Sequence, residues 1–582
     1  MKKMIFLVCS ILWMISVPLF ATLPQNWSEE NALWTKERKL SGGFPRSNIY
    51  ELNPQDFVKA QHQGQKYALS YPVNVTGLLI PYDSFKKFFS NDHSRNLWEL
   101  LAQKTVPWKD LPDFYRWAGF HQIPELANSD LNLTYRRGDA DLKDIMADDV
   151  MGATIIHRSI NGEKVRGLTF SCAGCHSSNL FGEKILGLTN RFPRANELFF
   201  MAKKMIPFVN TFFYREILSA TRAEGKMFEQ TKKSLNYVGV KEPLVLGLDT
   251  SLAQVGLSLS LRGQDADASL PNSLATSDQE VWWENEVLRQ RKILSHHPMN
   301  QIPADSKPMV WWNTKYKTKF LSDGSLVAGN PIFTNILWNE IGRGTDLKLL
   351  SKWIEENQLL LQELTHTVFN TKAPKYVNFF GRDSINVVKA QKGEQHFIQS
   401  CQKCHGSYEK DWNTLNTTKV TYHEVTPVID VGTDPYRYEG IKYFSDTLNK
   451  LNISKLFGTI VEPQKGYVPP PLEGIWARFP YMHNNSIPNL CALLTQTSSR
   501  PKSFYTGEAR DKKTDFDSEC VGYPIGEQAP VAWKSNKESF VDTTKLGMGN
   551  MGHDKKIFLT SEGVEKFTTE EKSELIEFLK TL

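Results

Sequence analysis

The sequence has no long run of basic residues and no low-complexity tract. Its 582 residues include 69 Lys plus Arg and 64 Asp plus Glu, which give a formal net charge of +5. Nucleic-acid binding therefore has little electrostatic support, because a phosphate backbone is bound by clustered basic side chains. A composition of 40% hydrophobic, 12% aromatic and 23% charged residues excludes both global disorder and a polytopic membrane protein. The length exceeds one ordinary hydrophobic core and suits two to four domains.

Cysteine is also scarce, with seven residues in the whole chain. Four of them form two C-x-x-C-H pentapeptides, which contain Cys172, Cys175 and His176, and Cys401, Cys404 and His405. No second cysteine pair follows either pentapeptide at the spacing of a zinc ribbon, which disfavours structural zinc. A thioredoxin-like redox pair leaves both histidines unexplained, whereas the attachment signature of c-type haem accounts for every position.

The spacing within each pentapeptide has a chemical reason. Two thiols three residues apart on one helical turn can bond the two vinyl groups of one porphyrin. The adjacent histidine then lies under the iron as its proximal ligand. We therefore expect two covalently bound haem c groups, with His176 and His405 as iron ligands.

The N-terminus has the pattern of a secretory signal peptide. Two lysines precede an apolar run of 17 residues from Met4 to Phe20, and Ala21 follows at a plausible cleavage site. An uncleaved anchor is the alternative, since the run reaches the lower limit of a spanning helix, but the small residue at Ala21 favours cleavage. We assign residues 1–21 to the signal peptide and expect a periplasmic or secreted protein without stable membrane insertion.

Export also bears on the remaining cysteines. Cys9 lies in the signal peptide and four cysteines lie in the pentapeptides, which leaves Cys491 and Cys520. Disulfides form and persist in oxidising compartments. We therefore predict a Cys491–Cys520 disulfide with a structural role.

The pattern of apolar residues predicts a mainly α fold with long ordered loops. The predicted domains are a loop-rich N-terminal extension (22–150), a first cytochrome c-like haem domain (151–384) and a second cytochrome c-like haem domain (385–582). In the first haem domain, residues 154–157 and 165–170 have the pattern of short strands, and residues 195–213 and 347–369 that of helices. The apolar segment 244–261 is interpreted as core, with a pocket lining as the alternative.

The second haem domain is expected to begin and end with a helix. A short helix leads into Cys401 with apolar residues at helical spacing. Residues 568–582 begin with a threonine N-cap, continue with acidic residues and carry leucine and isoleucine on one face. A first helix that carries the pentapeptide and a last helix that closes over it are typical of a cytochrome c domain.

Three further segments strengthen a resemblance to a known family. They are residues 308–317 (Pro-Met-Val-Trp-Trp-Asn-Thr-Lys-Tyr-Lys), 320–324 (Phe-Leu-Ser-Asp-Gly) and 470–488, which include Pro-Tyr-Met-His at 480–483. With the two pentapeptides, they resemble the bacterial dihaem cytochrome c peroxidase superfamily. The length, the distance between the pentapeptides and residues 470–488 are most similar to the large branch that includes rubber oxygenases. The resemblance covers roughly residues 150 to 582.

The resemblance implies a division of labour between two haems. One haem reacts with peroxide or dioxygen, and the other is six-coordinate and passes electrons. Trp312, with Trp311 beside it, corresponds to the tryptophan between the haems, and Phe320 is expected on the distal side of the reactive haem. A role in the core is the alternative for Trp312. A distal acid or base among Glu280, Glu284 and Glu286 is not selected, because a solvated helix face explains them better.

The resemblance also implies the sixth ligand of the second iron. In the oxygenase-like branch, a histidine in a glycine-rich C-terminal loop binds that iron, and residues 547–553 form such a loop here. We predict His553 as this ligand, with Met548 and Met551 as alternatives. His483 is expected to shape the pocket as a structural residue.

These features predict an exported dihaem oxidoreductase of the peroxidase type. Electrons from a small redox protein, a cytochrome or a cupredoxin, would enter at the His405 haem, and hydrogen peroxide would be reduced at the His176 haem. One alternative is a rubber-oxygenase-like dioxygenase that cleaves a hydrophobic polyisoprenoid with dioxygen. Another is a pure electron carrier. Whether calcium bridges the haem domains is left open.

Overall fold

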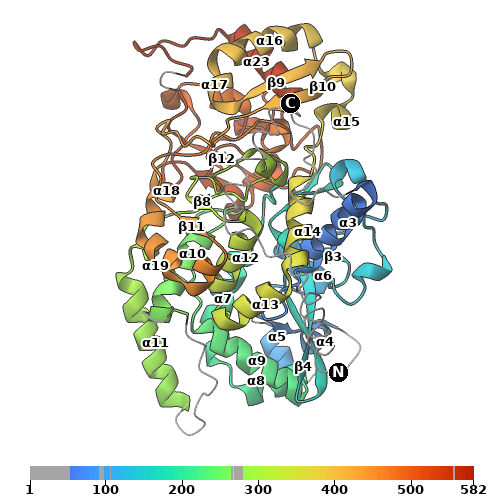
Figure 1. Ribbon diagram of the computed structural model, residues 1–582, viewed down its shortest axis with the longest axis vertical. Coiled ribbons are helices and arrows are strands. Elements are labelled where there is room, and N and C mark those ends of the chain that lie inside the picture. The colour runs from blue at the N-terminus through green and yellow to red at the C-terminus, as the bar shows by residue number, and fades with distance from the viewer. Residues whose placement is uncertain (1–52, 91–96, 105, 264–265, 268–278, 555–556) are drawn as a thin grey trace, which may run out of the picture.

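A computed structural model provides the structure of this chain. It describes residues 53–90, 97–104, 106–263, 266–267, 279–554 and 557–582. The predicted signal peptide, Cys9 and the first part of the N-terminal extension lie outside the described residues. Helices α16 (Val387–Ser400) and α23 (Thr569–Lys580) lie at one end of the molecule, and α4 (Tyr82–Phe89), α8 (Thr211–Leu218) and α9 (Arg222–Leu235) lie at the opposite end (Figure 1).

The C-terminal end is built on two helices that cross. α16 (Val387–Ser400) leads directly into Cys401, and the short α17 (Gln402–His405) carries the rest of the second pentapeptide. α23 (Thr569–Lys580) begins with a capping box and packs across α16. A Cβ at Gly393 would collide with the backbone carbonyl of Glu574, so glycine permits this close crossing. The predicted opening and closing helices are confirmed.

The first pentapeptide lies in a different setting. It follows the hairpin of β4 (Ala153–Ile160) and β5 (Glu163–Phe170), which confirms and extends the predicted strands. Its residues begin a single 3-10 turn, Cys172–Gly174, and β6 (Ser177–Leu180) follows at once. The expected helical turn is therefore wrong for this pentapeptide, because the chain enters and leaves it as strands.

Most of the middle of the chain is helical. The predicted helix at 195–213 is observed as α7 (Ala195–Met205) and α8 (Thr211–Leu218), separated by a turn that contains proline. The predicted helix at 347–369 is α13 (Leu347–Glu356) followed by α14 (Gln358–Phe369). α10 (Ser251–Arg262) is buried over most of its length, which confirms the interpretation of its apolar sequence as core.

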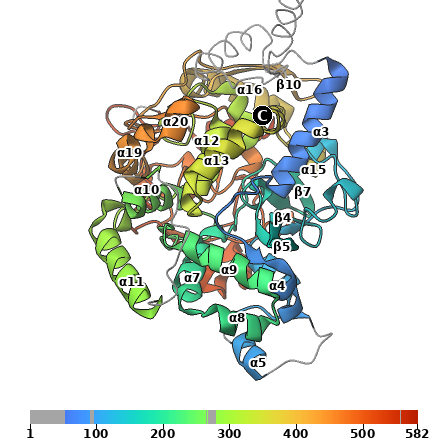
Figure 2. The same cartoon turned by 60° about the horizontal axis from the view of Figure 1, so that its bottom comes forward.

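The N-terminal extension contains more helix than predicted. α3 (Pro54–Ser70) begins at an Asn53 cap and packs along α14, where Gly64 allows close contact with the backbone of Glu363. Thr367 Oγ1 also donates to the carbonyl of Gln61 at 3.0 Å. The prediction of a loop-rich segment is therefore wrong for residues 54–70, which form a helix docked on the body. Figure 2 shows α3 beside the strands near the first pentapeptide.

The remaining elements are shorter or more peripheral. The other helices are α4 (Tyr82–Phe89), α5 (Leu97–Gln103), α6 (Leu111–Trp117), α9 (Arg222–Leu235), α11 (Gln279–His296), α12 (Pro331–Gly342), α15 (Tyr376–Phe380), α18 (Tyr436–Gly440), α19 (Ser445–Lys450), α20 (Asn452–Leu456), α21 (Leu490–Leu493) and α22 (Val531–Lys534). The other strands are β1 (Ile80–Pro81), β2 (His121–Gln122), β3 (Val150–Met151), β7 (Glu183–Leu186), β8 (Leu326–Ala328), β9 (Ser407–Asp411), β10 (Asn416–Thr421), β11 (Ile460–Val461), β12 (Ser503–Tyr505) and β13 (Phe540–Asp542). Among the described residues, no helix has the length and apolar character needed to cross a membrane.

Two large apolar clusters form the core, and adjacent tryptophans belong to different ones. Trp311 packs with the cluster that includes Phe320 and helices α10 and α12 to α14. Trp312 packs with the cluster beneath α16 and α23. The segment from Trp311 to Tyr316, a 3-10 helix, therefore lies at the boundary between the two halves of the molecule.

Candidate haem site

A largely apolar cavity with a volume of about 260 Å³ opens beside the second pentapeptide. Cys401, Cys404 and His405 all line it. Its apolar walls come from the segment 467–494 and from α23, and they include Val468, Leu472, Ile475, Leu490, Leu575 and Leu579. Thiols and an imidazole on the wall of an apolar cavity are the donor set and the surroundings that a covalently attached haem requires.

The proximal histidine is held by one backbone carbonyl. His405 Nδ1 lies 2.8 Å from the carbonyl oxygen of Pro470. Burial lowers the pKa of His405 to about 4, so the ring is neutral and Nδ1–H donates to this carbonyl. The lone pair then resides on Nε2, which is the atom that binds iron in such a histidine.

A second histidine lies across the cavity from the first. The ring centres of His405 and His553 are 6.1 Å apart, with 67° between the ring planes. Two metal–imidazole bonds of about 2.0 Å each, plus the distance from each nitrogen to its ring centre, span about 6 Å. Burial, and then the neighbouring His405, lower the pKa of His553 to about 3, which keeps this ring neutral and able to ligate. The spacing therefore suits one metal ion between the two imidazoles.

The loop that carries His553 is held in place by backbone contacts. The φ angle of His553 is 60° and that of the preceding Gly552 is 83°, so two consecutive residues have a left-handed backbone conformation. Its N–H donates to the carbonyl of Val431 at 2.9 Å. Asn484 Nδ2 donates to the carbonyls of Gly547 and Gly549 at 3.1 and 3.0 Å. These contacts fix a glycine-rich loop at the distance that ligation needs.

The two alternative methionines occupy other positions. Met548 is fully buried in the apolar cluster, and Met551 is 45% exposed. Neither lines the cavity, whereas His553 does. His483 also lines it, but its ring stacks on Tyr467 with centres 3.9 Å apart. His483 thus shapes the wall of the cavity, as the sequence led us to expect.

The predicted disulfide is confirmed. Cys491 and Cys520 are bonded, with their Cα atoms 5.0 Å apart. The bond ties α21 to the loop around residue 520, next to Leu490 on the cavity wall. The disulfide therefore helps to hold the wall of the cavity around Leu490 in place.

The first pentapeptide repeats the proximal arrangement. His176 Nδ1 lies 3.0 Å from the carbonyl oxygen of Met309, and burial lowers the pKa of His176 to about 4. Burial also raises the pKa of the Cys172 and Cys175 thiols, to about 11 and 12. The donor set thus fits a second covalent haem, since thioether formation removes the thiol protons altogether.

The aromatic residues predicted around the first iron are all buried but have different neighbours. The ring of Trp311, and not that of Trp312, lies against His176, with ring centres 5.3 Å apart. Trp312 is fully buried and donates from Nε1 to the carbonyl of Glu473 at 2.8 Å. Phe320 is buried in the same cluster as Trp311. Glu280, Glu284 and Glu286 fall in α11, at positions where the side chains lie outside the described part of the structure.

A short chain of contacts connects the two proximal histidines. Met309, which accepts from His176, lies four residues before Asn313. Asn313 Nδ2 donates to the carbonyl of Pro471 at 2.9 Å, and the adjacent Pro470 carbonyl accepts from His405. Two backbone stretches, 309–313 and 470–471, and three hydrogen bonds therefore run from one imidazole to the other.

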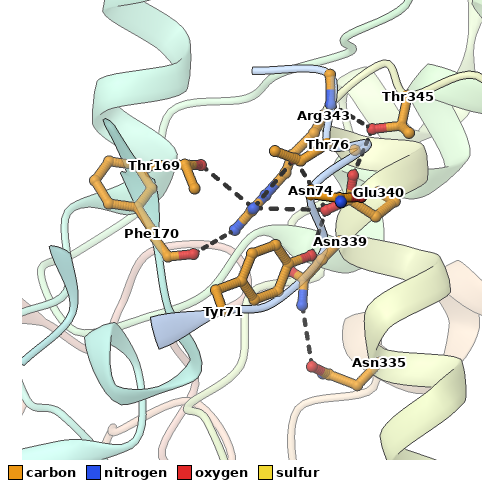
Figure 3. Close-up of polar contacts among 12 residues, drawn as sticks. Tyr71, Asn74, Thr76, Thr169, Phe170, Asn335, Asn339, Glu340, Arg343 and Thr345 are labelled. Atoms are coloured by element: carbon orange, nitrogen blue, oxygen red, sulfur yellow. Dashed lines mark hydrogen bonds and ion pairs between the residues drawn. The ribbon is translucent and has the colours of Figure 1, made fainter. Parts of the chain in front are cut away.

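A buried carboxylate that sequence reasoning missed lies near the first pentapeptide. Glu340, on α12, accepts hydrogen bonds from the hydroxyls of Tyr71, Thr76 and Thr345, the last two at 3.1 and 2.5 Å. It also pairs with Arg343 at 3.5 Å (Figure 3). Four donors thus occupy this carboxylate. The sequence held no signal for the network, because Tyr71 and Glu340 are 269 residues apart.

Arg343 carries this network to the attachment site. Its Nη2 donates to the carbonyl of Phe170 at 3.0 Å, two residues before Cys172. Its charge opposes the rise that burial causes in the pKa of the Cys172 thiol. Its guanidinium lies 4.2 Å from the centre of the Tyr71 ring. Through Arg343, the N-terminal segment around Tyr71 is therefore connected to β5, the strand that leads into the first pentapeptide.

Comparison with known proteins identifies one part of this site. Residues 466–505 match the family model described as RoxA-like, cytochrome c-like. This segment is similar to a RoxA-like cytochrome c domain. The matched segment includes Pro470, which orients His405, and much of the cavity wall. A domain of this kind implies haem c and indicates a haem oxidoreductase, and it supports the rubber-oxygenase-like branch of the resemblance.

Two similar proteins come from Sinorhizobium fredii (strain NBRC 101917 / NGR234). The chain is 24% identical to "Uncharacterized protein y4iJ" over 486 residues, which cover 72% of this chain and 78% of that protein. It is 28% identical to "Uncharacterized protein y4iM" over 189 residues, which cover 30% of this chain and 42% of that protein. The similarity to y4iJ extends far beyond the RoxA-like segment.

Proposed function

We propose that this chain is an exported dihaem c-type oxidoreductase that reduces hydrogen peroxide with electrons from a small redox protein. The single observation that carries the proposal is the contrast between the two pentapeptides. His405 faces the His553 ring at 6.1 Å, whereas the ring contact of His176 within the described residues is with Trp311. One site is built to be six-coordinate and the other to keep a position for a small ligand.

The residues of the chain have distinct roles in this proposal. When bound, each haem supplies an iron that cycles between two oxidation states. Pro470 and Met309 hold the proximal imidazoles neutral and oriented through their carbonyls. His553 closes the far side of the second cavity, so that site exchanges electrons without binding substrate. The connection through Asn313 gives the two sites electronic contact.

Trp311 and Phe320 form the apolar surroundings of the first site. Both belong to the buried cluster that packs against the thiol of Cys172. Such surroundings exclude bulk water and strengthen every electrostatic interaction within them. Cleavage of a peroxide bond also needs a group that moves a proton. Glu340 does not serve as that group, because its oxygens are occupied by Tyr71, two threonines and Arg343.

A second function is favoured by a specific observation. The RoxA-like match at residues 466–505 supports a dioxygenase that cleaves a hydrophobic polyisoprenoid. A dioxygenase of this kind would use the apolar cluster around Trp311 without a free distal carboxylate. The first site would then bind dioxygen, and the second site would set the oxidation state of the iron in the first.

Two assays separate these functions. Purified holoprotein is first checked for two haems per chain by mass and pyridine haemochrome. Peroxide with a reduced small cytochrome should give turnover far above background, and no oxidation above background would reject the peroxidase. Polyisoprene under oxygen should give carbonyl-ended fragments only if the protein is a dioxygenase. Unchanged spectra with both cyanide and carbon monoxide would reject both enzymes in favour of an electron carrier.

A further inference from the structure

Three basic side chains line the cavity beside the second pentapeptide. They are Lys307, Lys317 and Arg478. Among the described residues, none of the three forms an ion pair with a carboxylate, and burial is the main influence that lowers the pKa of each. The charged groups that act on Lys307 and Lys317 are other cations, including Arg478 in both cases. The cavity wall therefore carries concentrated positive charge without a protein counter-charge.

The hydrogen bonds of these cations are incomplete. Lys307 Nζ donates to the carbonyls of Arg478 and Pro480, each at 2.5 Å, and Arg478 Nη1 donates to the carbonyl of Pro471 at 2.9 Å. No acceptor within the described part of the chain binds Lys317 Nζ, although an ammonium group has three donors. Arg191 makes a useful contrast, because it is buried nearby and has an acceptor at each of its three nitrogens.

This arrangement is costly unless an anion enters the cavity. A buried charge is tolerated when it is paired and hydrogen-bonded. Arg478 cannot lose its proton to relieve the repulsion, because a guanidinium remains charged in proteins. Lys317 is only 5% exposed, so water cannot substitute fully for a partner. The cavity is therefore suited to a ligand that combines negative charge with a large apolar surface.

We infer that Lys317 and Arg478 form a carboxylate-binding site for the propionate groups of the haem attached to Cys401 and Cys404. The inference rests on the part of the proposed function that places a haem in this cavity. A haem presents one apolar porphyrin face and two carboxylates, which matches a wall of apolar residues interrupted by unpaired cations. Lys307 adds positive charge from the segment that also holds His176 through Met309. The propionates thus contact the strip of chain that connects the two sites.

The test measures the low-spin haem of the holoprotein in Lys317→Met, Lys317→Arg and Lys352→Met. Lys317→Met removes the charge and keeps the length of the side chain. Its low-spin haem should have a lower midpoint potential, because a neighbouring cation favours the reduced iron. That potential should also acquire a pH dependence between about pH 5 and 8, since an unpaired buried carboxyl titrates higher. Lys317→Arg should restore the wild-type behaviour, and the exposed Lys352→Met should match wild type.

A potential and a pH profile identical to wild type in Lys317→Met, with two haems still attached, would overturn the inference. If that variant fails to fold, resonance Raman spectroscopy of the wild-type protein provides the decision. Its propionate bending bands should shift in deuterium oxide, because the donors on the carboxylates exchange, and bands without a shift would also overturn it. Neither readout involves peroxide or polyisoprene. If the wild-type holoprotein shows no turnover with peroxide or polyisoprene but gives the expected propionate signal, the result therefore counts against the proposed function alone.

Discussion

His405 and His553 lie on opposite walls of one apolar cavity, with their ring centres 6.1 Å apart. They are 148 positions apart in the sequence and reach the cavity from α17 and from a glycine-rich loop. The backbone positions both: the carbonyl of Pro470 orients one ring, and the carbonyl of Val431 anchors the residue that carries the other. The pair therefore determines the ligation that the second iron is expected to have.

Replacement of His553 tests this pair directly. His553→Ala should convert the second haem from low spin to high spin, because the sixth ligand is lost and neither Met548 nor Met551 lines the cavity. Electron paramagnetic resonance and the visible spectrum of the oxidised protein measure the change. Met551→Ala is the matched control, since Met551 is in the same loop and 45% exposed, and it should leave the spectrum unchanged. A low-spin signal that survives in His553→Ala would contradict the assignment.

Asn313 should influence the exchange of electrons between the two haems. Asn313→Leu removes one hydrogen bond to the carbonyl of Pro471, which still accepts from Arg478, so the free energy of unfolding should fall by only about 0.5–1.5 kcal/mol. The interhaem rate, measured by flash photolysis of the half-reduced carbon monoxide complex, should fall while both proximal ligands remain bound. Asn339→Leu, on the part-buried face of α12, should not alter it. Equal rates in wild type and Asn313→Leu would show that this connection is not used.

Glu340 should be a strong determinant of stability. Glu340→Gln leaves the buried charge of Arg343 without its partner, and breaking a buried pair in this way costs roughly 3–5 kcal/mol. The control is Glu356→Gln, which removes an exposed pair with Lys352 and should cost less than about 1 kcal/mol. Denaturant unfolding curves give both values. Similar small losses in the two variants would mean that the network contributes little.

The crossing of α16 and α23 should weaken in acid. Glu574 on α23 accepts from His396 at 2.9 Å and pairs with Lys392 at 3.1 Å, and the hydrogen bond from His396 is the main cause that lowers the pKa of Glu574. A carboxyl whose pKa is lower in the folded state stabilises the fold above its unfolded value of about 4.3, and this contribution is lost as the pH falls further.

Denaturant unfolding at a series of pH values tests this contribution. Glu574→Gln should lose less stability than wild type between about pH 5 and pH 3. The exposed Glu527→Gln should follow the wild-type curve. Parallel curves for wild type and Glu574→Gln would show that the contacts with His396 and Lys392 do not depend on this charge.

Local sequence was sufficient for several features of this protein. The two pentapeptides, the helix into Cys401, the closing helix and the strands before Cys172 were all predicted from spacing and periodicity. The Cys491–Cys520 bond followed from elimination. Each of these depends on residues that are near each other in the chain or on a small count of one residue type. The RoxA-like match at 466–505 adds support for a cytochrome c domain.

Tertiary structure decided the rest. Only the fold shows that α3 is docked on α14, that the first pentapeptide lies between strands, and that Trp311 and not Trp312 contacts His176. The same holds for the carbonyls that orient the imidazoles and for the unpaired cations on the cavity wall. Every residue has a backbone carbonyl, so the residue type does not indicate which carbonyl accepts a given hydrogen bond. The charge balance of a cavity depends on side chains from distant segments. The sequence by itself therefore determined where haem is predicted to attach, and the packing of remote segments decided what surrounds each pentapeptide.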